Sequence, residues 1–193
     1  EVEAPITMSG TFTLDLSDKM VTAGEQMAAS NGMLCIFTTT GNIIIQNGSI
    51  NSTVCRGIYV QSGEFRLNNV DITTYKRALM IDNALATVDQ NCVLSIGEGG
   101  NDAAIVVWGT GNYETDSISQ HPKLHFYGIA DSTRSVDNYA AISGNGQDRS
   151  YTYIYIYDGA ELTSNGHALY VPQPGDVYIS GGTLTGSGAI GMK

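Results

Sequence analysis

Basic residues are scarce in this sequence, and so is proline. The 193 residues include 9 Lys and Arg, 19 Asp and Glu, and 4 Pro, so the formal net charge is −10. No run of basic residues exceeds the pair Lys76-Arg77. Because phosphate binding requires a basic patch, the sequence argues against a nucleic-acid partner. An acidic surface that carries Tyr suits neutral sugars or cations better than polyanions.

The sequence also lacks a membrane span and a regular cysteine framework. No apolar stretch approaches the roughly 18 residues that cross a bilayer. The three cysteines, Cys35, Cys55 and Cys92, form no CxxC pair, and an odd number cannot pair completely. We expect small thiols buried in the core. A bridge between Cys35 and Cys55 stays open, because these residues lie one repeat length apart.

The remaining composition is that of an ordered chain. Only 15% of the residues are charged and 42% are hydrophobic, which argues against disorder. The length is sufficient for one sizeable core. The 23 Gly and 11 Tyr, together with many Asn, Ser and Thr, favour β-structure rich in turns.

Internal repetition indicates the fold. A small residue followed by alternating apolar positions recurs as Gly57-Ile-Tyr-Val60, Ala78-Leu-Met-Ile81, Ala104-Ile-Val-Val107, Ala168-Leu-Tyr-Val171 and Ala189-Ile-Gly-Met192, with Ala141-Ile142 as a weaker copy. A polar turn, a second short apolar segment such as Ile154-Tyr-Ile156 and a third such as Ala160-Glu-Leu162 follow. Their period-two alternation predicts three short strands in each repeat.

Strands of this length predict a solenoid, because they cannot bury one face alone. Stacked coils about 4.8 Å apart pair each strand with its equivalents above and below. We therefore predict an all-β fold, a single-stranded right-handed parallel β-helix of about six or seven coils. The predicted core contains Ile58, Val60, Leu79, Ile81, Ile105, Val107, Leu169 and Val171.

The two ends of the chain depart from the repeat. Residues 1–40 match it poorly, so we expect an irregular N-terminal capping segment there, with strands at Thr11–Leu16 and Met33–Phe37. Coils with surface-loop insertions are expected over residues 41–193. Four insertions are expected, near Gly97–Asp102, Gly109–Pro122, Ala130–Tyr139 and Gly144–Ser150. The last residues stop inside a fresh copy of the first segment. We therefore expect an open or truncated end that is followed by the rest of a longer polypeptide or covered by a partner.

Four segments carry a family resemblance: Gly57-Ile-Tyr-Val-Gln-Ser-Gly63, Val70-Asp-Ile-Thr73, Gly166-His-Ala-Leu-Tyr-Val171 and Val177-Tyr-Ile-Ser-Gly-Gly-Thr-Leu-Thr-Gly186. They resemble the β-helical domains of bacterial surface proteins of gut anaerobes, and more distantly the pectate lyase-like superfamily. Some of those relatives are described as adhesins or carbohydrate-binding domains. The resemblance implies a secreted or cell-surface location and a glycan or cell-surface polysaccharide as partner. The repeated residues are structural, so it is specific for the fold and weak for function.

The sequence shows no recognisable catalytic centre, metal site or cofactor site. The Gly-His-Gly motif of β-helical hydrolases is absent, because Ala168 follows Gly166-His167. His121 and His125 are four residues apart, but on a predicted strand, which is not zinc-ligand spacing. The charges that lyase chemistry would need, at Arg56, Lys76, Arg77, Asp71 and Asp82, are interpreted as solvated surface.

The outward positions suggest a binding surface instead. The middle residue of each short strand points away from the core, and the C-terminal repeats place Tyr there. We expect Tyr155 and Tyr178 to stack one coil apart, with His125 continuing the column. A flat aromatic strip suits the apolar faces of sugar rings, and phenol groups bond sugar hydroxyls. The candidate ligand-binding residues are Tyr155, Tyr178, His125, Tyr153, Tyr157, Tyr59 and Tyr170.

The function predicted from the sequence is a non-catalytic surface module, an adhesin or polysaccharide-binding β-helix. One alternative is a polysaccharide lyase or glycoside hydrolase whose active residues are not recognisable. Another is a structural spacer or phage tail component, in which Tyr serves only as a good exposed strand residue.

Overall fold

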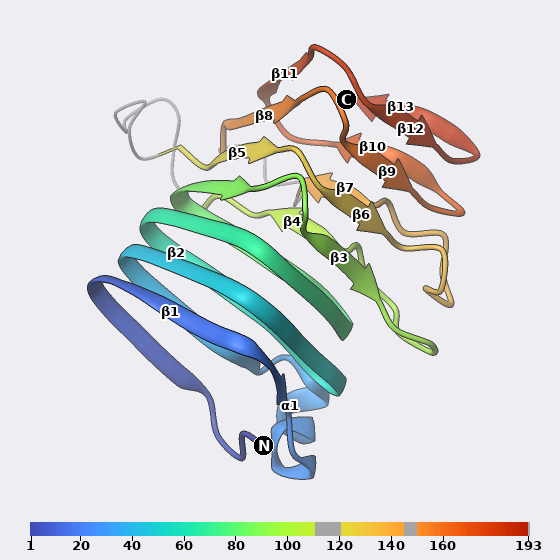
Figure 1. Ribbon diagram of the computed structural model, residues 1–193. Helices are drawn as coiled ribbons and strands as arrows, with labels where there is room; N and C mark the ends of the chain where they lie inside the picture. The colour runs from blue at the N-terminus through green and yellow to red at the C-terminus, as the bar shows by residue number, and fades with distance from the viewer. Residues whose placement is uncertain (111–120, 145–149, 193) are drawn as a thin grey trace.

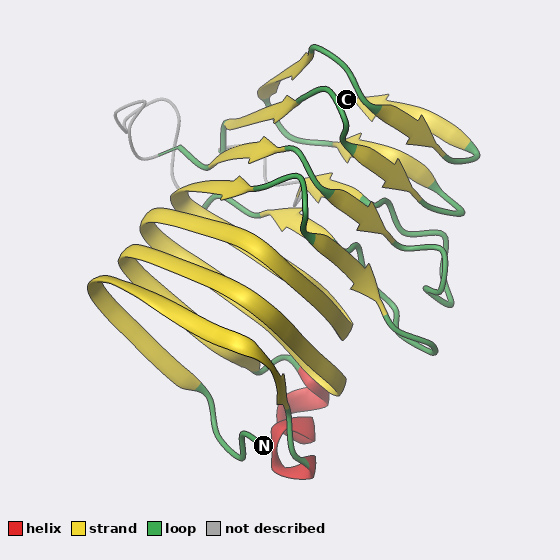
Figure 2. Cartoon of the chain, viewed as in Figure 1, coloured by secondary structure: helices red, strands yellow, loops and turns green. Residues whose placement is uncertain are grey.

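The computed structural model describes residues 1–110, 121–144 and 150–192 (Figure 1). Within these ranges almost all regular structure is strand, as Figure 2 shows. The strands are β1 (Ile6–Thr22), β2 (Cys35–Val88), β3 (Val93–Ile96), β4 (Ile105–Val107), β5 (Lys123–Phe126), β6 (Ile129–Asp131), β7 (Ile142–Gly144), β8 (Thr152–Ile156), β9 (Glu161–Thr163), β10 (His167–Val171), β11 (Gly175–Ile179), β12 (Thr183–Thr185) and β13 (Gly188–Met192). The helical segments are η1 (Glu25–Ala28) and α1 (Ala29–Gly32). The predicted all-β class is therefore confirmed.

All strands join one parallel sheet that wraps about 307° round an axis, as expected for a β-helix-like solenoid. β2 winds round the axis as a continuous ribbon, and the later coils consist of separate short strands (Figure 1). From β2 onward the pairing defines three columns. The first column contains residues 79–81 of β2 followed by β4, β7, β10 and β13. The second contains residues 85–88 of β2 followed by β5, β8 and β11, and the third residues 71–74 of β2 followed by β3, β6, β9 and β12.

The core consists of in-register lines of apolar side chains. In the first column Leu79 pairs with Ile105, which pairs with Ile142, which pairs with Leu169. Because successive side chains of a strand alternate between faces, one register places every second residue of all coils inside. All eight predicted core residues are 0% exposed, so this prediction is confirmed.

Regular structure begins earlier than expected. β1 pairs in parallel with β2, from Ile6 beside Phe37 to Thr22 beside Asn51, with one register shift between Asp15 and Lys19. The expectation of an irregular cap over residues 1–40 is therefore wrong for residues 6–22. The pairing was not predicted because this segment lacks the small-residue box and is bent at Gly10, where φ is +96°.

The three cysteines lie in the core, and the last coil is left partly exposed. Cys35, Cys55 and Cys92 are free and buried, so the expected core thiols are confirmed and the Cys35–Cys55 bridge is absent. Ile179 and Ile190 are more than 40% exposed, because no further described strand covers β11 and β13. None of the helices among the described residues is long and apolar enough to cross a membrane.

Candidate functional site

The outward side of the second column carries a stack of aromatic rings. His125 on β5, Tyr155 on β8 and Tyr178 on β11 are register partners in consecutive strands. The His125 and Tyr155 ring centroids lie 4.5 Å apart at an interplanar angle of 9°, and those of Tyr155 and Tyr178 lie 4.9 Å apart at 7°. We call these three rings the aromatic ladder. Its geometry confirms the predicted stacking, and the parallel register is its cause, because equivalent positions recur at strand spacing.

A second stack lies beside the ladder. The rings of Tyr127 and Tyr157 are 4.1 Å apart at 5°, and His125 Nδ1 shares a hydrogen bond of 2.7 Å with the Tyr157 hydroxyl. Tyr127 was absent from the sequence-based set because it lies one residue beyond β5. The alternation in Lys123-Leu-His-Phe-Tyr127 places Tyr127 on the outward side beside His125, and this signal could have identified it.

The other side of the ladder carries the charged groups. Lys123 and Asp176 are the register partners of Tyr153 on its two sides. The Lys123 ammonium lies 5.5 Å from the centre of the Tyr153 ring. The hydroxyls of Tyr151 and Tyr178 donate hydrogen bonds to Asp176, at 3.0 and 3.5 Å. Below we use the name aromatic face for Lys123, His125, Tyr127, Tyr153, Tyr155, Tyr157, Asp176 and Tyr178.

Electrostatics leave the aromatic face nearly uncharged at neutral pH. Burial and, to a smaller extent, Lys123 lower the pKa of His125, so the imidazole is neutral. Burial and the Tyr127 hydroxyl raise the pKa of Tyr157, and Asp176 raises that of Tyr178, so these phenols stay protonated. One ammonium and one carboxylate remain. The face therefore presents hydrogen-bonding groups rather than a net charge.

The stacking changes which parts of the rings a ligand can reach. Tyr155 lies between His125 and Tyr178, so both faces of its ring are covered. The ring can offer its edge and its hydroxyl, but it cannot lie flat against a sugar as the sequence had suggested. Within the described part of the chain, the Tyr153 and Tyr155 hydroxyls have no hydrogen-bond partner, so both are available to a ligand.

Two of the predicted site residues lie elsewhere, because they belong to the first column. Tyr59 donates a hydrogen bond of 2.9 Å to Asp82, and burial followed by this contact raises its pKa to about 12. Tyr170 is exposed and packs against His167 with 5.4 Å between ring centroids. The structure thus brings together five of the seven candidates, namely His125, Tyr153, Tyr155, Tyr157 and Tyr178.

Three of the five charges considered for lyase chemistry, Arg56, Arg77 and Asp82, are held in internal contacts, whereas Asp71 is exposed. Arg56 and Asp82 are 6% and 7% exposed, so the expectation of solvated surface is wrong for them. Asp82 accepts hydrogen bonds from Tyr59 and from the backbone and hydroxyl of Thr110. Arg77 pairs with Asp102 at 2.8 Å and lies 4.9 Å from the Trp108 ring. No group of three metal-ligating side chains gathers anywhere in residues 1–110, 121–144 and 150–192.

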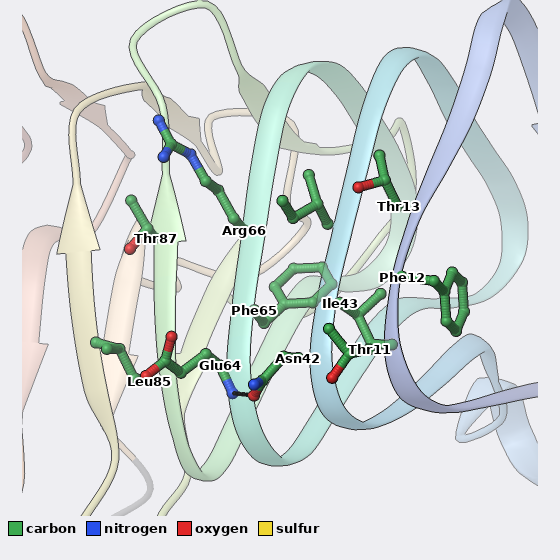
Figure 3. A pocket seen from close by; sticks show the side chains of 11 residues that line it. Thr11, Phe12, Thr13, Asn42, Ile43, Glu64, Phe65, Arg66, Leu85 and Thr87 are labelled. Atoms are coloured by element: carbon green, nitrogen blue, oxygen red, sulfur yellow. Dashed lines mark hydrogen bonds between the residues drawn. The ribbon is translucent and has the colours of Figure 1, made fainter.

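Two grooves lie on the second column next to the aromatic face. One, of about 390 Å³, is lined on its outward side by Thr13, Ile44, Arg66 and Thr87 (Figure 3). The other, of about 480 Å³, is lined by Arg66, Thr87 and Tyr127 together with Asp89, which pairs with Arg66 at 2.8 Å. The grooves share Arg66 and Thr87, and the second includes a ring of the aromatic face. The second column thus offers one continuous surface.

No protein-family model, curated protein or solved structure matches this chain.

Proposed function

We propose that this chain is a non-catalytic β-helix module, secreted or displayed on a bacterial cell surface, that binds a polysaccharide at its aromatic face. In this proposal the solenoid is right-handed, has about six or seven coils and belongs with the pectate lyase-like proteins. The observation that carries the proposal is the in-register ladder of His125, Tyr155 and Tyr178.

The ladder suits a polyhydroxyl ligand because its groups are ordered before binding. A stacked ring that is held by a neighbour on each side loses little side-chain entropy when a ligand docks. The free hydroxyls of Tyr153 and Tyr155 can donate to and accept from sugar hydroxyls. A few such contacts give an affinity on the order of millimolar to micromolar. Many copies on a surface would raise the apparent affinity through avidity, as an adhesin requires.

One observation favours the alternative of a lyase or hydrolase. The hydrogen bond of 2.7 Å between His125 and Tyr157 joins two groups that can exchange protons. A catalytic site also needs a group that stabilises the developing charge, and the one cation of the aromatic face, Lys123, lies over the Tyr153 ring, on the other side of the ladder from Tyr157. We therefore expect no turnover of uronic-acid polymers, with or without calcium. Product release that disappears in His125→Gln would establish the enzyme instead.

A glycan array followed by titration of the strongest hit tests the proposal. The key variant is Tyr155→Phe combined with Tyr178→Phe, which removes two hydroxyls and retains the stacked rings. We expect it to weaken binding by roughly tenfold, the effect of two lost hydrogen bonds. Tyr170→Phe on the first column is the matched control and should bind like the parent. If no glycan binds, or the double variant binds like the parent, the ladder is structural and the spacer function gains support.

A further inference from the structure

The surface of the second column extends far beyond the aromatic face. The outward position that the ladder occupies continues beyond the second column, through the earlier turns of β2 to β1. In chain order its residues are Thr13, Ile44, Arg66, Thr87, His125, Tyr155 and Tyr178. With strands about 4.8 Å apart, the line is about 29 Å long. Both grooves lie along it, and Figure 3 shows Arg66 and Thr87 on neighbouring turns of β2, with Thr13 on β1 beyond the turn that carries Ile43.

We infer that the ligand is a linear, neutral glycan that lies along the solenoid axis and crosses the strands, from the aromatic ladder into the grooves at Thr87 and Arg66. This inference rests on the proposed function and specifies the orientation, minimum length and charge of the ligand. A hexasaccharide-sized chain would cover the line from end to end.

The orientation of the ligand follows from the extent of the surface along a strand and along the solenoid axis. Along a strand it is short, because β8 has five residues, about 16 Å. Along the axis, the stacked rings turn one edge outward per strand, so a chain in this direction meets a hydrogen-bonding group at each step from Tyr178 to Arg66. Tyr178 and Tyr155 supply hydroxyls, His125 an imidazole edge and Thr87 a hydroxyl. Arg66 then supplies a guanidinium whose Nε and Nη2 donate to Asp89.

The charge of the ligand follows from the charges along the same line. Arg66 is paired with Asp89, and Asp176 accepts hydrogen bonds from two tyrosines. The ammonium of Lys123 and the exposed carboxylate of Glu64 have opposite signs. No basic cluster therefore offers binding to a polyanion, and the chain as a whole carries −10. Repulsion by this net charge disfavours uronic-acid and sulfated polymers.

The test uses cello-, xylo- and manno-oligosaccharides, each from the disaccharide to the octasaccharide, titrated calorimetrically against the intact chain. We expect the affinity for at least one series to rise with length up to about the hexasaccharide, the length of the 29 Å line. Thr87→Val removes one hydroxyl outside the ladder without changing side-chain size. It should weaken binding of the hexasaccharide roughly threefold to tenfold, and leave the disaccharide unaffected. Thr163→Val on the third column is the control and should change neither.

The outcomes separate this inference from the proposed function. If trisaccharides bind as tightly as octasaccharides and Thr87→Val has no effect, while Tyr155→Phe weakens every length, the ligand does not follow the axis but the aromatic face still binds glycan. Polygalacturonate is titrated as an anionic probe beside the three neutral series; if it alone binds, the ligand is not neutral and the proposed function stands. If no probe binds, this inference is overturned, and the proposed function falls with it when the glycan array also finds no ligand.

Discussion

Removing the middle ring of the aromatic ladder should destabilise the fold more than removing its end. Tyr155 stacks on His125 and on Tyr178, whereas Tyr178 stacks on Tyr155 alone among the described rings. A stacked aromatic pair contributes about 0.5–1.5 kcal/mol beyond the burial of its area. Tyr155→Ala should therefore cost about 1–3 kcal/mol, and Tyr178→Ala about 0.5–1.5 kcal/mol.

Urea unfolding followed by circular dichroism measures both costs. The double variant completes a thermodynamic cycle, and we expect a coupling energy of about 0.5–1.5 kcal/mol, the contribution of the one stack that the two residues share. The slope of the unfolding free energy against urea should stay unchanged, since each substitution alters little of the exposed surface. Tyr170→Ala, which removes an exposed ring outside the ladder, is the control.

The result that would refute this reasoning is additivity. If Tyr155→Ala costs no more than Tyr178→Ala, or if the coupling energy is zero within error, the rings lie in register without stabilising one another. The pre-organisation on which the proposed binding mode depends would then have no energetic basis.

Three further predictions concern the core, the histidine of the ladder and the thiols. Leu169→Asp should unfold the solenoid, because an unpaired charge in a packed core costs several kcal/mol, whereas Tyr170→Asp, next in the chain and pointing outward, should leave the circular dichroism spectrum unchanged. Because the pKa of His125 is lowered from 6.5, the unfolded chain takes up this proton first, so its contribution to stability is present above about pH 6.5 and is lost as the pH falls below it. His125→Phe should flatten that part of a plot of urea midpoint against pH, and an unchanged profile would contradict the assignment. Burial raises the pKa of Cys35 to about 11 and also covers Cys55 and Cys92, so a thiol reagent should modify the three cysteines only after unfolding, and rapid labelling of the native chain would be inconsistent with the fold.

The repeated boxes were sufficient to predict the strand columns and their core, because burial in a parallel stack requires the same inward positions in every coil. The equivalent positions of Leu79, Ile105 and Leu169 in their repeats were therefore sufficient to predict the stack. The strands at Val93–Ile96 and Ile129–Asp131 were missed because each is short and Ala130 is a small inward residue. A strand at Thr11–Leu16 was predicted, but the parallel pairing of β1 with β2 was not, because the partners lie 31 residues further on, at a larger spacing than most repeats, as in Ile6 beside Phe37.

The candidate site could be predicted only in part. Alternation places Tyr153, Tyr155 and Tyr157 outward, and the register places Tyr178 beside Tyr155. Which face of each ring is covered depends on side-chain rotamers and on strand spacing, which no residue pattern records. Similarly, Tyr59 has the outward position that alternation predicts, but its contact with Asp82 depends on how neighbouring coils pack.

The first column differs from the second in a way that matters for redesign. β4 is buried on both sides, because outward Val106 packs with Met80 and Ala103, next to Tyr59 and Trp108, in a small apolar cluster outside the coil. The segment that carries Ala103 therefore covers the outward side of β4, and shortening it would expose these apolar side chains to water. The first and second columns should therefore differ in how well they tolerate outward substitutions. Outward substitutions on the second column change an exposed surface and remove no covering segment, so a library aimed at new ligands belongs there. Loop exchange at the first column needs a matching change of Met80 and Val106.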